Sequence, residues 1–351
     1  MIKILNKEET LGVLSEGRKN NLNFIRFIAA VMVIFGHSYA ATLSYKMGDP
    51  ICRLTKNQLD FGGLAVSIFF VYGGFLIAKS MERLKETKKY FKARIIRIFP
   101  PLIFVTFVAT FIMGPLVTVL PLSRYFSDYA TYRYLLNSLM ILIHDLPGVF
   151  IDNINTSVNG PLWTLPVEFS CYIMCYFSYK LKLLDEKIAK YTVIPAIIFY
   201  YIMYVSLSDM PIIREALRPI MLFYVGMIYY VYRNKVKFEY KYLIISLIFL
   251  IVGSVADIMQ FAIIVFLPYI LFCIGYGTTR KLEHFGEKME ISYGIYLFGW
   301  PVQQCVVFFL GKETLPLIVF IIAVPIAIIC GVITFNLVEK PITLWAKGRK
   351  E

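Results

Sequence analysis

Cysteine, histidine and charge are all scarce in this sequence of 351 residues. Six cysteines are too few for a disulfide-stapled scaffold. The three histidines, at positions 37, 144 and 284, lie too far apart for the ligand spacing of a zinc site, so no metal cofactor is expected. Charged residues make up 17% of the chain, against roughly 25% in a typical soluble domain. The composition therefore excludes a soluble globular protein and a disulfide-rich secreted one.

Apolar residues dominate what is present. Hydrophobic residues supply 58% of the chain, and 25 tyrosines and 29 phenylalanines give the aromatic content typical of membrane interfaces. The formal net charge of +13 falls in clusters between long apolar runs, which favours membrane orientation over nucleic-acid binding as the role of these charges. We therefore predict an integral membrane protein of the all-α class, built as a polytopic bundle of transmembrane helices.

Ten apolar runs approach the roughly 20 residues that a membrane-spanning helix needs. They cover approximately 22–42, 61–79, 98–119, 162–180, 191–208, 217–232, 241–256, 258–277, 290–310 and 315–337. A further run at 139–143 is stopped by His144, Asp145 and Pro147. We expect this run not to span, so that 121–160 forms one long outer loop.

The distribution of lysine and arginine orients these spans. With both ends of the chain in the cytosol, 27 of the 36 basic residues fall on the cytosolic side, 8 fall outside, and Arg26 alone lies within a span. Cytosolic loops of membrane proteins carry an excess of lysine and arginine, so this distribution favours the orientation with both ends in the cytosol. We expect a cytosolic N-terminal segment at 1–21, a membrane domain at 22–338 and a cytosolic basic tail at 339–351.

Two ionisable side chains lie within the first predicted span, where charge is costly and usually functional. Arg26 and His37 are eleven residues apart, so they project from one helix face and are separated by about 16 Å along its axis. We expect both to face a common cavity, with Arg26 near the cytosolic end and His37 deep in the outer half. His37 is the candidate proton acceptor because imidazole titrates near neutral pH. The alternatives are a snorkelling Arg26 and a packed core histidine.

Glu168 enters the membrane in the fourth predicted span, within GPLWTLPVEF. A buried carboxylate needs a partner, and His37 or Arg26 could supply one. Bound to His37, the carboxylate would fix the tautomer of the imidazole. A structural Glu–Arg pair between two helices explains the residue equally well.

Arg94 and Arg97 precede the third predicted span at a spacing of three residues, so both guanidinium groups share one helix face at the membrane surface. Arginine binds phosphate in a bidentate geometry, which suits a nucleotide or CoA headgroup. Membrane anchoring alone also explains basic residues at this place. In the second span, Gly73 and Gly74 permit close approach of another helix or of a substrate.

An ordered set of motifs runs through nearly the whole chain. It comprises Arg26 and His37 at their spacing, FFVYGGFLI, the pair Arg94 and Arg97, GPLWTLPVEF, ISYGIYLFGWPV and VEKP. In this order the motifs resemble the acyltransferase family 3 membrane proteins, bacterial O-acyltransferases that typically modify surface carbohydrates. One departure is Gly299, where many members carry a histidine.

The resemblance implies transfer of an acyl group, usually acetyl, from cytosolic acyl-CoA to a hydroxyl of a surface glycan or its lipid-linked precursor, in the bacterial inner membrane. By the same resemblance His37 is the catalytic residue and Glu168 an active-site carboxylate, while Arg26, Arg94 and Arg97 serve the donor. Direct attack by the hydroxyl and a covalent acyl-imidazole on His37 both fit this assignment.

Polar and aromatic side chains in the outer half are candidate contacts for the sugar acceptor: Trp163, Trp300, Gln303 and Gln304. The alternatives are an interfacial position for the tryptophans and interhelical hydrogen bonding for the glutamines. The rival functional class is a transporter or flippase for a sugar or lipid-linked sugar. It would need polar groups at several depths, and transporters often carry internal repeats. The spans after the fourth are mostly apolar and no repeat is visible.

Overall fold

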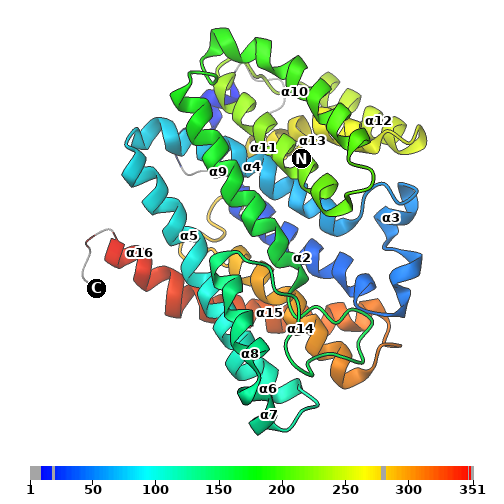
Figure 1. Ribbon diagram of the computed structural model, residues 1–351. Coiled ribbons are helices and arrows are strands. Elements are labelled where there is room, and N and C mark those ends of the chain that lie inside the picture. The colour runs from blue at the N-terminus through cyan, green and yellow to red at the C-terminus, as the bar shows by residue number, and fades with distance from the viewer. Residues whose placement is uncertain (1–8, 18–19, 278–281, 347, 349–351) are drawn as a thin grey trace.

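The computed structural model of the chain describes residues 9–17, 20–277, 282–346 and 348. Across this part of the chain the protein is all-α, as predicted, with no extended strand (Figure 1). The portions of the predicted cytosolic ends at 1–8, 18–19, 347 and 349–351 lie outside the described residues. The long helices are α2 (Leu22–Ala40), α4 (Phe61–Leu84), α5 (Thr87–Val108), α9 (Thr164–Lys180), α10 (Glu186–Ser206), α11 (Pro211–Val231), α12 (Tyr240–Val255), α13 (Met259–Tyr276), α14 (Ser292–Leu310) and α15 (Pro316–Thr334).

Each predicted span overlaps one of these helices. In the described part of the chain, seven helical stretches are long and apolar enough to cross a bilayer. Of the other long helices, α9 and α12 are shorter, at 17 and 16 residues, and α11 contains Arg214, Glu215 and Arg218. The third predicted span begins near 98, but α5 already begins at Thr87, because the basic segment before the apolar run is itself helical. The segment Tyr134–Leu139, within the predicted outer loop, forms a six-residue 3-10 helix, which is too short to span.

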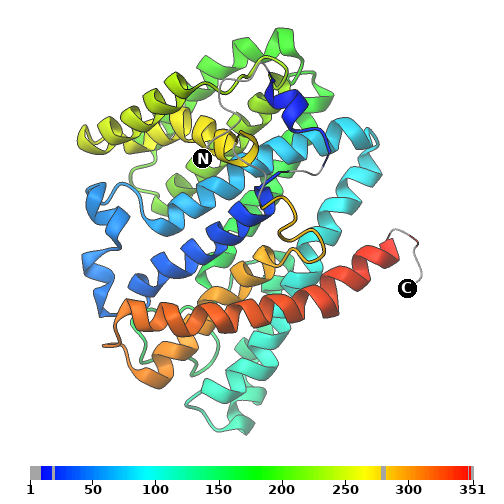
Figure 2. The same ribbon diagram turned by 180° about the vertical axis from the view of Figure 1, so that it is seen from behind.

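Helix α2 lies at the centre of the bundle, in contact with α4, α14 and α15. Helix α4 packs along α11, and α12 pairs with α13, as both views show (Figures 1 and 2). The chain leaves α15 through a π-helical segment (Phe335–Glu339) and ends in α16 (Lys340–Ala346). The helix that carries His37 is therefore held between the helices of the second and ninth predicted spans.

Several helices have an aspartate as their N-cap, because its carboxylate can accept hydrogen bonds from the free backbone N–H groups of the first turn. Asp60 accepts a hydrogen bond from the backbone N–H of Gly63 at 2.5 Å and caps α4. Asp49 accepts one from Cys52 at 2.9 Å and caps the short helix α3 (Pro50–Leu54). These two caps fix the backbone at the end of the bundle that is predicted to face outward.

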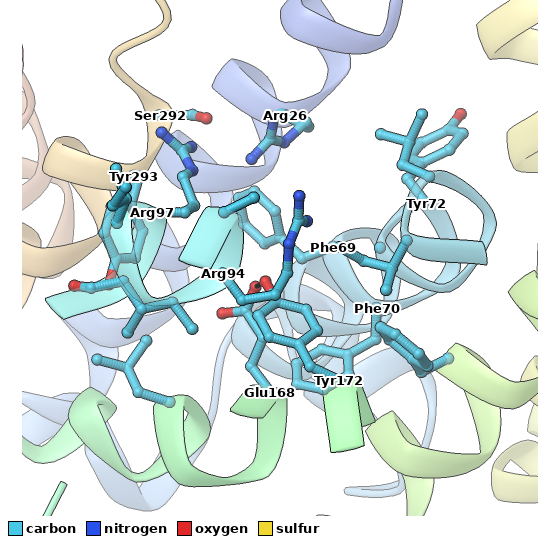
Figure 3. A pocket seen from close by; sticks show the side chains of 18 of the residues that line it. Arg26, Phe69, Phe70, Tyr72, Arg94, Arg97, Glu168, Tyr172, Ser292 and Tyr293 are labelled. Carbon is cyan, nitrogen blue, oxygen red and sulfur yellow. Dashed lines mark hydrogen bonds between the residues drawn. The ribbon is translucent and has the colours of Figure 1, made fainter. Parts of the chain in front are cut away.

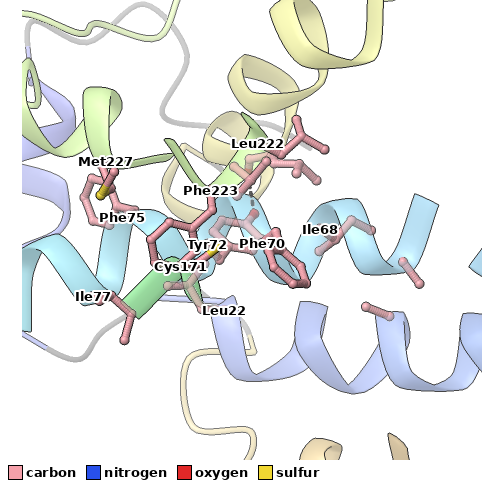
Figure 4. Packing of buried hydrophobic residues seen from close by; sticks show 14 of the residues in the cluster. Leu22, Ile68, Phe70, Tyr72, Phe75, Ile77, Cys171, Leu222, Phe223 and Met227 are labelled. Atoms are coloured by element: carbon pink, nitrogen blue, oxygen red, sulfur yellow. Dashed lines mark hydrogen bonds between the residues drawn. The ribbon is translucent and has the colours of Figure 1, made fainter. Parts of the chain in front are cut away.

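The contact between α4 and α11 depends on two glycines. A Cβ on Gly74 would overlap the carbonyl oxygen of Phe223, and one on Gly226 would overlap that of Val71. Aromatic and aliphatic side chains of both helices fill the space beside this crossing (Figure 4). Of the two alternatives for the glycine pair, Gly74 serves helix packing.

We predict that Gly74→Ala destabilises the protein by about 1–3 kcal/mol, because α4 and α11 must separate to admit the methyl group. Gly73→Ala is the matched control, since a Cβ there would stand 3.5 Å from the Phe223 ring, an ordinary contact. Thermal unfolding of both variants in detergent measures the difference. Equal melting temperatures for the two variants would contradict the close crossing.

Candidate active site

A cavity of about 730 Å³ lies at the predicted cytosolic end of the bundle, between α2, α4, α5, α9 and α14. Its wall is largely aliphatic and aromatic, and its polar members are Arg26, Tyr72, Lys89, Lys92, Arg94, Arg97, Thr164, Glu168, Tyr172, Ser292, Tyr293, Tyr296 and Thr343. Figure 3 shows three arginines and Glu168 converging from α2, α5 and α9. In the described part of the chain, no three His, Cys, Asp or Glu side chains gather as metal ligands would.

Arg97 is held by two carboxylates. Its guanidinium donates to Glu339 Oε2 at 2.5 Å and to Glu290 Oε2 at 2.6 Å. Arg26 makes an ion pair with the same Glu290 oxygen at 3.4 Å. The cluster of Arg26, Arg97, Glu290 and Glu339, hereafter the arginine–glutamate cluster, ties α2 and α5 to the segments that precede α14 and α16.

Glu290 lies just before α14, and its charge is stabilised from several directions. Burial alone would raise the pKa of Glu290, but the charges of Arg26 and Arg97 and hydrogen bonds from Ser292 lower it to about 2. The backbone N–H of Ser292 donates to Glu290 Oε1 at 3.0 Å. Glu290 therefore stays ionised at any physiological pH and offsets part of the charge of both arginines.

Arg94 differs from Arg97, although both line the same cavity. Its guanidinium lies over the rings of Tyr90 and Tyr172, 5.8 and 5.6 Å from their centroids, and donates to Ser80 Oγ at 3.4 Å. Its Nε is buried without a hydrogen-bond partner, and no carboxylate of the described residues pairs with it. Arg94 is thus a cation with donors to spare for an anionic ligand.

Glu168 lines the cavity from α9 and accepts a hydrogen bond from the Tyr172 hydroxyl. Tyr172 lies one helical turn further along α9, so this contact is local to one helix. The sequence favoured His37 or Arg26 as partner, but among the described residues Tyr172 is the hydrogen-bond partner found.

His37 lies further along α2, toward the end predicted to face outward. Its ring packs edge-on against Trp300 of α14, with the centroids 5.3 Å apart and the planes at 85°. Its Nε2 faces Gly62, where a Cβ would stand 3.4 Å away, and its Nδ1 is buried without a hydrogen-bond partner. A ring that packs on a tryptophan and has an unpaired Nδ1 agrees with both alternatives for this residue, core packing and chemistry.

The cavity stops short of His37. Its innermost members include Val66 and Phe69 of α4 and Tyr296 of α14, and the rings of Phe69 and Tyr296 meet with their centroids 6.1 Å apart. The expectation that Arg26 and His37 share one cavity is therefore wrong, because Arg26 lines the cavity and His37 does not. The physical reason is that the contacting rings of Phe69 and Tyr296 occupy the end of the cavity nearest His37.

The candidate acceptor contacts are mostly interior. Gln303 is fully buried and donates to Ile34 O and Ser38 Oγ of α2, both at 2.7 Å. Gln304 is also fully buried and donates to Ser157 O at 2.8 Å in the predicted outer loop. Gln303 thus makes the interhelical hydrogen bonds that were the alternative to substrate binding, while Gln304 binds the predicted outer loop. Trp163 is half-buried at the end of a 3-10 helix (Gly160–Trp163).

Comparison with known proteins decides the family. Residues 19–336 match the family model described as an acyltransferase domain. The chain belongs to this acyltransferase family. It is 26% identical over 340 residues to an O-acetyl transferase of Shigella phage Sf6, covering 92% of this chain and 96% of that protein. It is 30% identical over 175 residues to nodulation protein 10 of Rhizobium leguminosarum bv. viciae, covering 45% of this chain and 44% of that protein. No solved structure matches it.

Membership confirms the family resemblance drawn from the motifs, and the apolar helices make this acyltransferase a membrane protein. Sequence reasoning missed Glu290, Glu339 and Asp60, although Glu339 stands in the VEKP motif and Asp60 directly precedes the second span. It also took Arg26 as the one basic residue within a span, whereas Arg218 lies within α11 and is 8% exposed. Pro211 could have shown that the helix begins before Arg218, because proline is favoured in the first turn of a helix.

We predict that Glu290→Ala lowers the stability of this acyltransferase by about 1–3 kcal/mol, because two guanidinium groups lose a shared carboxylate in a partly exposed site. Glu86→Ala removes the exposed partner of Lys89 and should cost about 0–1 kcal/mol. The pKa of Glu290 is lowered from 4.5 to about 2, so its contribution is complete above pH 4.5 and is lost as the pH falls toward 2.

Thermal unfolding between pH 3 and pH 8 measures both effects. The gap between wild type and Glu290→Ala should be constant above about pH 5 and shrink below it. A gap no larger than that of Glu86→Ala would show that the arginine–glutamate cluster contributes nothing beyond a surface ion pair.

Proposed function

We propose that this acyltransferase is an O-acetyltransferase that moves an acetyl group from cytosolic acyl-CoA to a hydroxyl of a surface glycan or its lipid-linked precursor, in the bacterial inner membrane. The observation that carries the proposal is the cavity: it holds a cation with unused donors at one end and approaches His37 at the other. The name of the phage relative supports the O-acetyl assignment.

The charged end of the cavity suits the phosphates of CoA. Arg94 has no carboxylate partner among the described residues, and Lys89 and Lys92 add positive charge on the same helix. Arg26 and Arg97 share their charge with Glu290 and so shape the wall more than they add charge to it. A phosphate bound by Arg94 would gain charge-assisted hydrogen bonds that the free protein leaves unmade.

The aromatic part of the cavity suits the rest of the donor. Val66 lies four residues from Gly62 on α4, and Tyr296 lies four residues from Trp300 on α14. Four helical residues correspond to about 6 Å, so the cavity ends one turn below the residues that contact His37. A pantetheine arm that follows the cavity would therefore bring its thioester to the aromatic pair below His37.

In the proposed reaction, neutral His37 accepts the proton of the acceptor hydroxyl as its oxygen attacks the thioester carbonyl. A carbon–oxygen bond forms and the carbon–sulfur bond breaks. The CoA sulfur leaves with the electron pair and takes up a proton, which restores neutral His37. In the covalent alternative, the imidazole nitrogen attacks the thioester carbonyl, the carbon–sulfur bond breaks, and the CoA sulfur leaves and takes up the imidazole proton. The acceptor hydroxyl then attacks the acetyl-imidazole, the carbon–nitrogen bond breaks, and the hydroxyl proton restores neutral His37.

The rival function is transport of a sugar or lipid-linked sugar. It would need a polar path through the bundle, but the cavity ends at Phe69 and Tyr296, and Gln303 is occupied by hydrogen bonds to α2. Glycan movement by purified protein in vesicles, without acetylation, would favour this rival.

We predict that Arg94→Ala raises the KM for acetyl-CoA by about tenfold or more, because loss of a charged hydrogen-bonding partner costs about 1.5–3 kcal/mol. Transfer of labelled acetyl groups by purified protein in detergent measures this effect. Lys88→Ala is the matched control, because Lys88 is exposed on the same helix outside the cavity. An unchanged KM in Arg94→Ala would remove this residue from the donor site.

We predict that His37→Ala lowers kcat by about 10²–10⁴, the usual contribution of a general acid or base. His284→Ala is the control, since His284 is exposed at the opposite end of the protein from His37. Rapid mixing of labelled acetyl-CoA without acceptor distinguishes the two routes, because the covalent one leaves label on wild type and none on His37→Ala. Full activity in His37→Ala would overturn the assignment.

A further inference from the structure

His37 has a carboxylate neighbour that is not Glu168. Asp60 precedes α4 at the predicted outer end of the bundle, and its side chain is exposed to solvent. A Cβ on Gly62 would stand 3.4 Å from His37 Nε2 and 3.8 Å from Asp60 Oδ1. Both atoms therefore lie beside Gly62, which has no side chain to separate them. The negative charge of Asp60 favours the protonated form of the His37 ring.

The position of Asp60 is fixed by the helix that it caps. Its Oδ1 accepts the Gly63 N–H at 2.5 Å, which holds the carboxylate beside Gly62. Arg218 of α11 approaches the same place, because a Cβ on Gly63 would stand 2.6 Å from its Nη2 and 2.7 Å from Asp60 Oδ1. Arg218 in turn donates to Gln260 Oε1 at 3.1 Å. Arg218 also makes an ion pair with Glu215 at 3.7 Å, so the Asp60 carboxylate lies near a guanidinium that has its own acidic partner on one side and near the imidazole on the other.

The other groups around His37 are neutral or already bound. From α14, Trp300 and Gln303 carry no charge, and the side chains that α15 packs against α2 are apolar. Asp49 approaches α2 at Gly36, but its two oxygens accept the backbone N–H groups of Cys52 and Phe61, at 2.9 and 2.7 Å.

The remaining titratable groups near this end of α2 are not carboxylates. They are Tyr39, on α2 itself, Lys46, in the 3-10 segment that follows, and Arg218 of α11. Glu168 is bound to Tyr172 on the wall of the cytosolic cavity, below the ring pair of Phe69 and Tyr296. Asp60 is therefore the carboxylate best placed to respond to a proton on His37.

We propose that Asp60 is the positioning residue that stabilises the protonated form of His37 during transfer, acting across the bare Cα of Gly62. The proposal rests on the proposed function. When His37 takes the hydroxyl proton, positive charge appears on the imidazole, and the negative charge of Asp60 lowers its energy. Because Asp60 is exposed, the acceptor hydroxyl would approach His37 from this outer side while the donor occupies the cytosolic cavity.

The test separates this role from helix capping. Asp60→Asn keeps a residue that caps well and removes the charge. We expect kcat to fall about tenfold or more. The acidic limb of the pH profile should move about one unit to lower pH, because His37 then holds its proton less tightly. A residue that serves only as a cap would leave the position of the limb unchanged.

Two variants are matched controls. Asp49→Asn changes another capping carboxylate close to α2, and Glu168→Gln changes the carboxylate that the sequence first favoured; both should leave the acidic limb in place. A limb that moves in Glu168→Gln but not in Asp60→Asn would overturn the proposal in favour of Glu168. Wild-type protein without acetyl transfer from acetyl-CoA would instead count against the proposed function.

A second measurement needs no acetyl transfer. Diethylpyrocarbonate modifies the neutral imidazole, so its rate against pH follows the charge of His37 in a background of His144→Ala and His284→Ala. We expect Asp60→Asn to move the midpoint of this curve about one unit lower, and Asp49→Asn to leave it unchanged. Identical midpoints in wild type and Asp60→Asn would reject the proposal, whatever the enzyme transfers.

Discussion

The need to pair charge inside an apolar bundle organises the predicted cytosolic end of this protein. An unpaired guanidinium there would be costly, and Arg97 meets two carboxylates that come from distant parts of the chain. Since Arg26 shares Glu290, the same cluster also fixes the inner end of α2. The cavity beside it thus has one wall made rigid by paired charges, while Arg94 is left among tyrosines with donors unused.

His37 is approached from two sides that differ in character. On the side predicted to be cytosolic, the cavity is lined by cationic side chains at one end and by aromatic rings, including Phe69 and Tyr296, at the end nearest His37. On the outer side an exposed carboxylate stands next to the imidazole. A two-substrate reaction in which the donor is cytosolic and the acceptor is a glycan would use both approaches without requiring either substrate to cross the membrane.

Much of this arrangement could be predicted from the sequence. Apolar runs of the right length located all the long helices, and the spacing of Arg94 and Arg97 placed both on one face toward one cavity. The partners of Arg97 could not be found this way, because Glu339 lies 242 positions away and only packing brings it near. The position of His37 beyond the cavity was equally hidden, since rings from two other helices separate it from Arg26.

The π-helical turn joins α15 to α16 without a break, although the two helices lie in different surroundings. A π-helical turn contains one more residue than an α-helical turn. The side-chain faces of α15 and α16 are therefore rotated relative to each other. Before the turn, α15 presents side chains such as Leu317 and Ile321 to the outside of the bundle; after it, Thr343 and Ala346 line the cavity. Glu339 ends the turn, where its carboxylate meets Arg97. Removing one residue here would restore the α-helical spacing and rotate the Glu339 carboxylate away from Arg97, so segment length is as tightly constrained at this junction as side-chain identity.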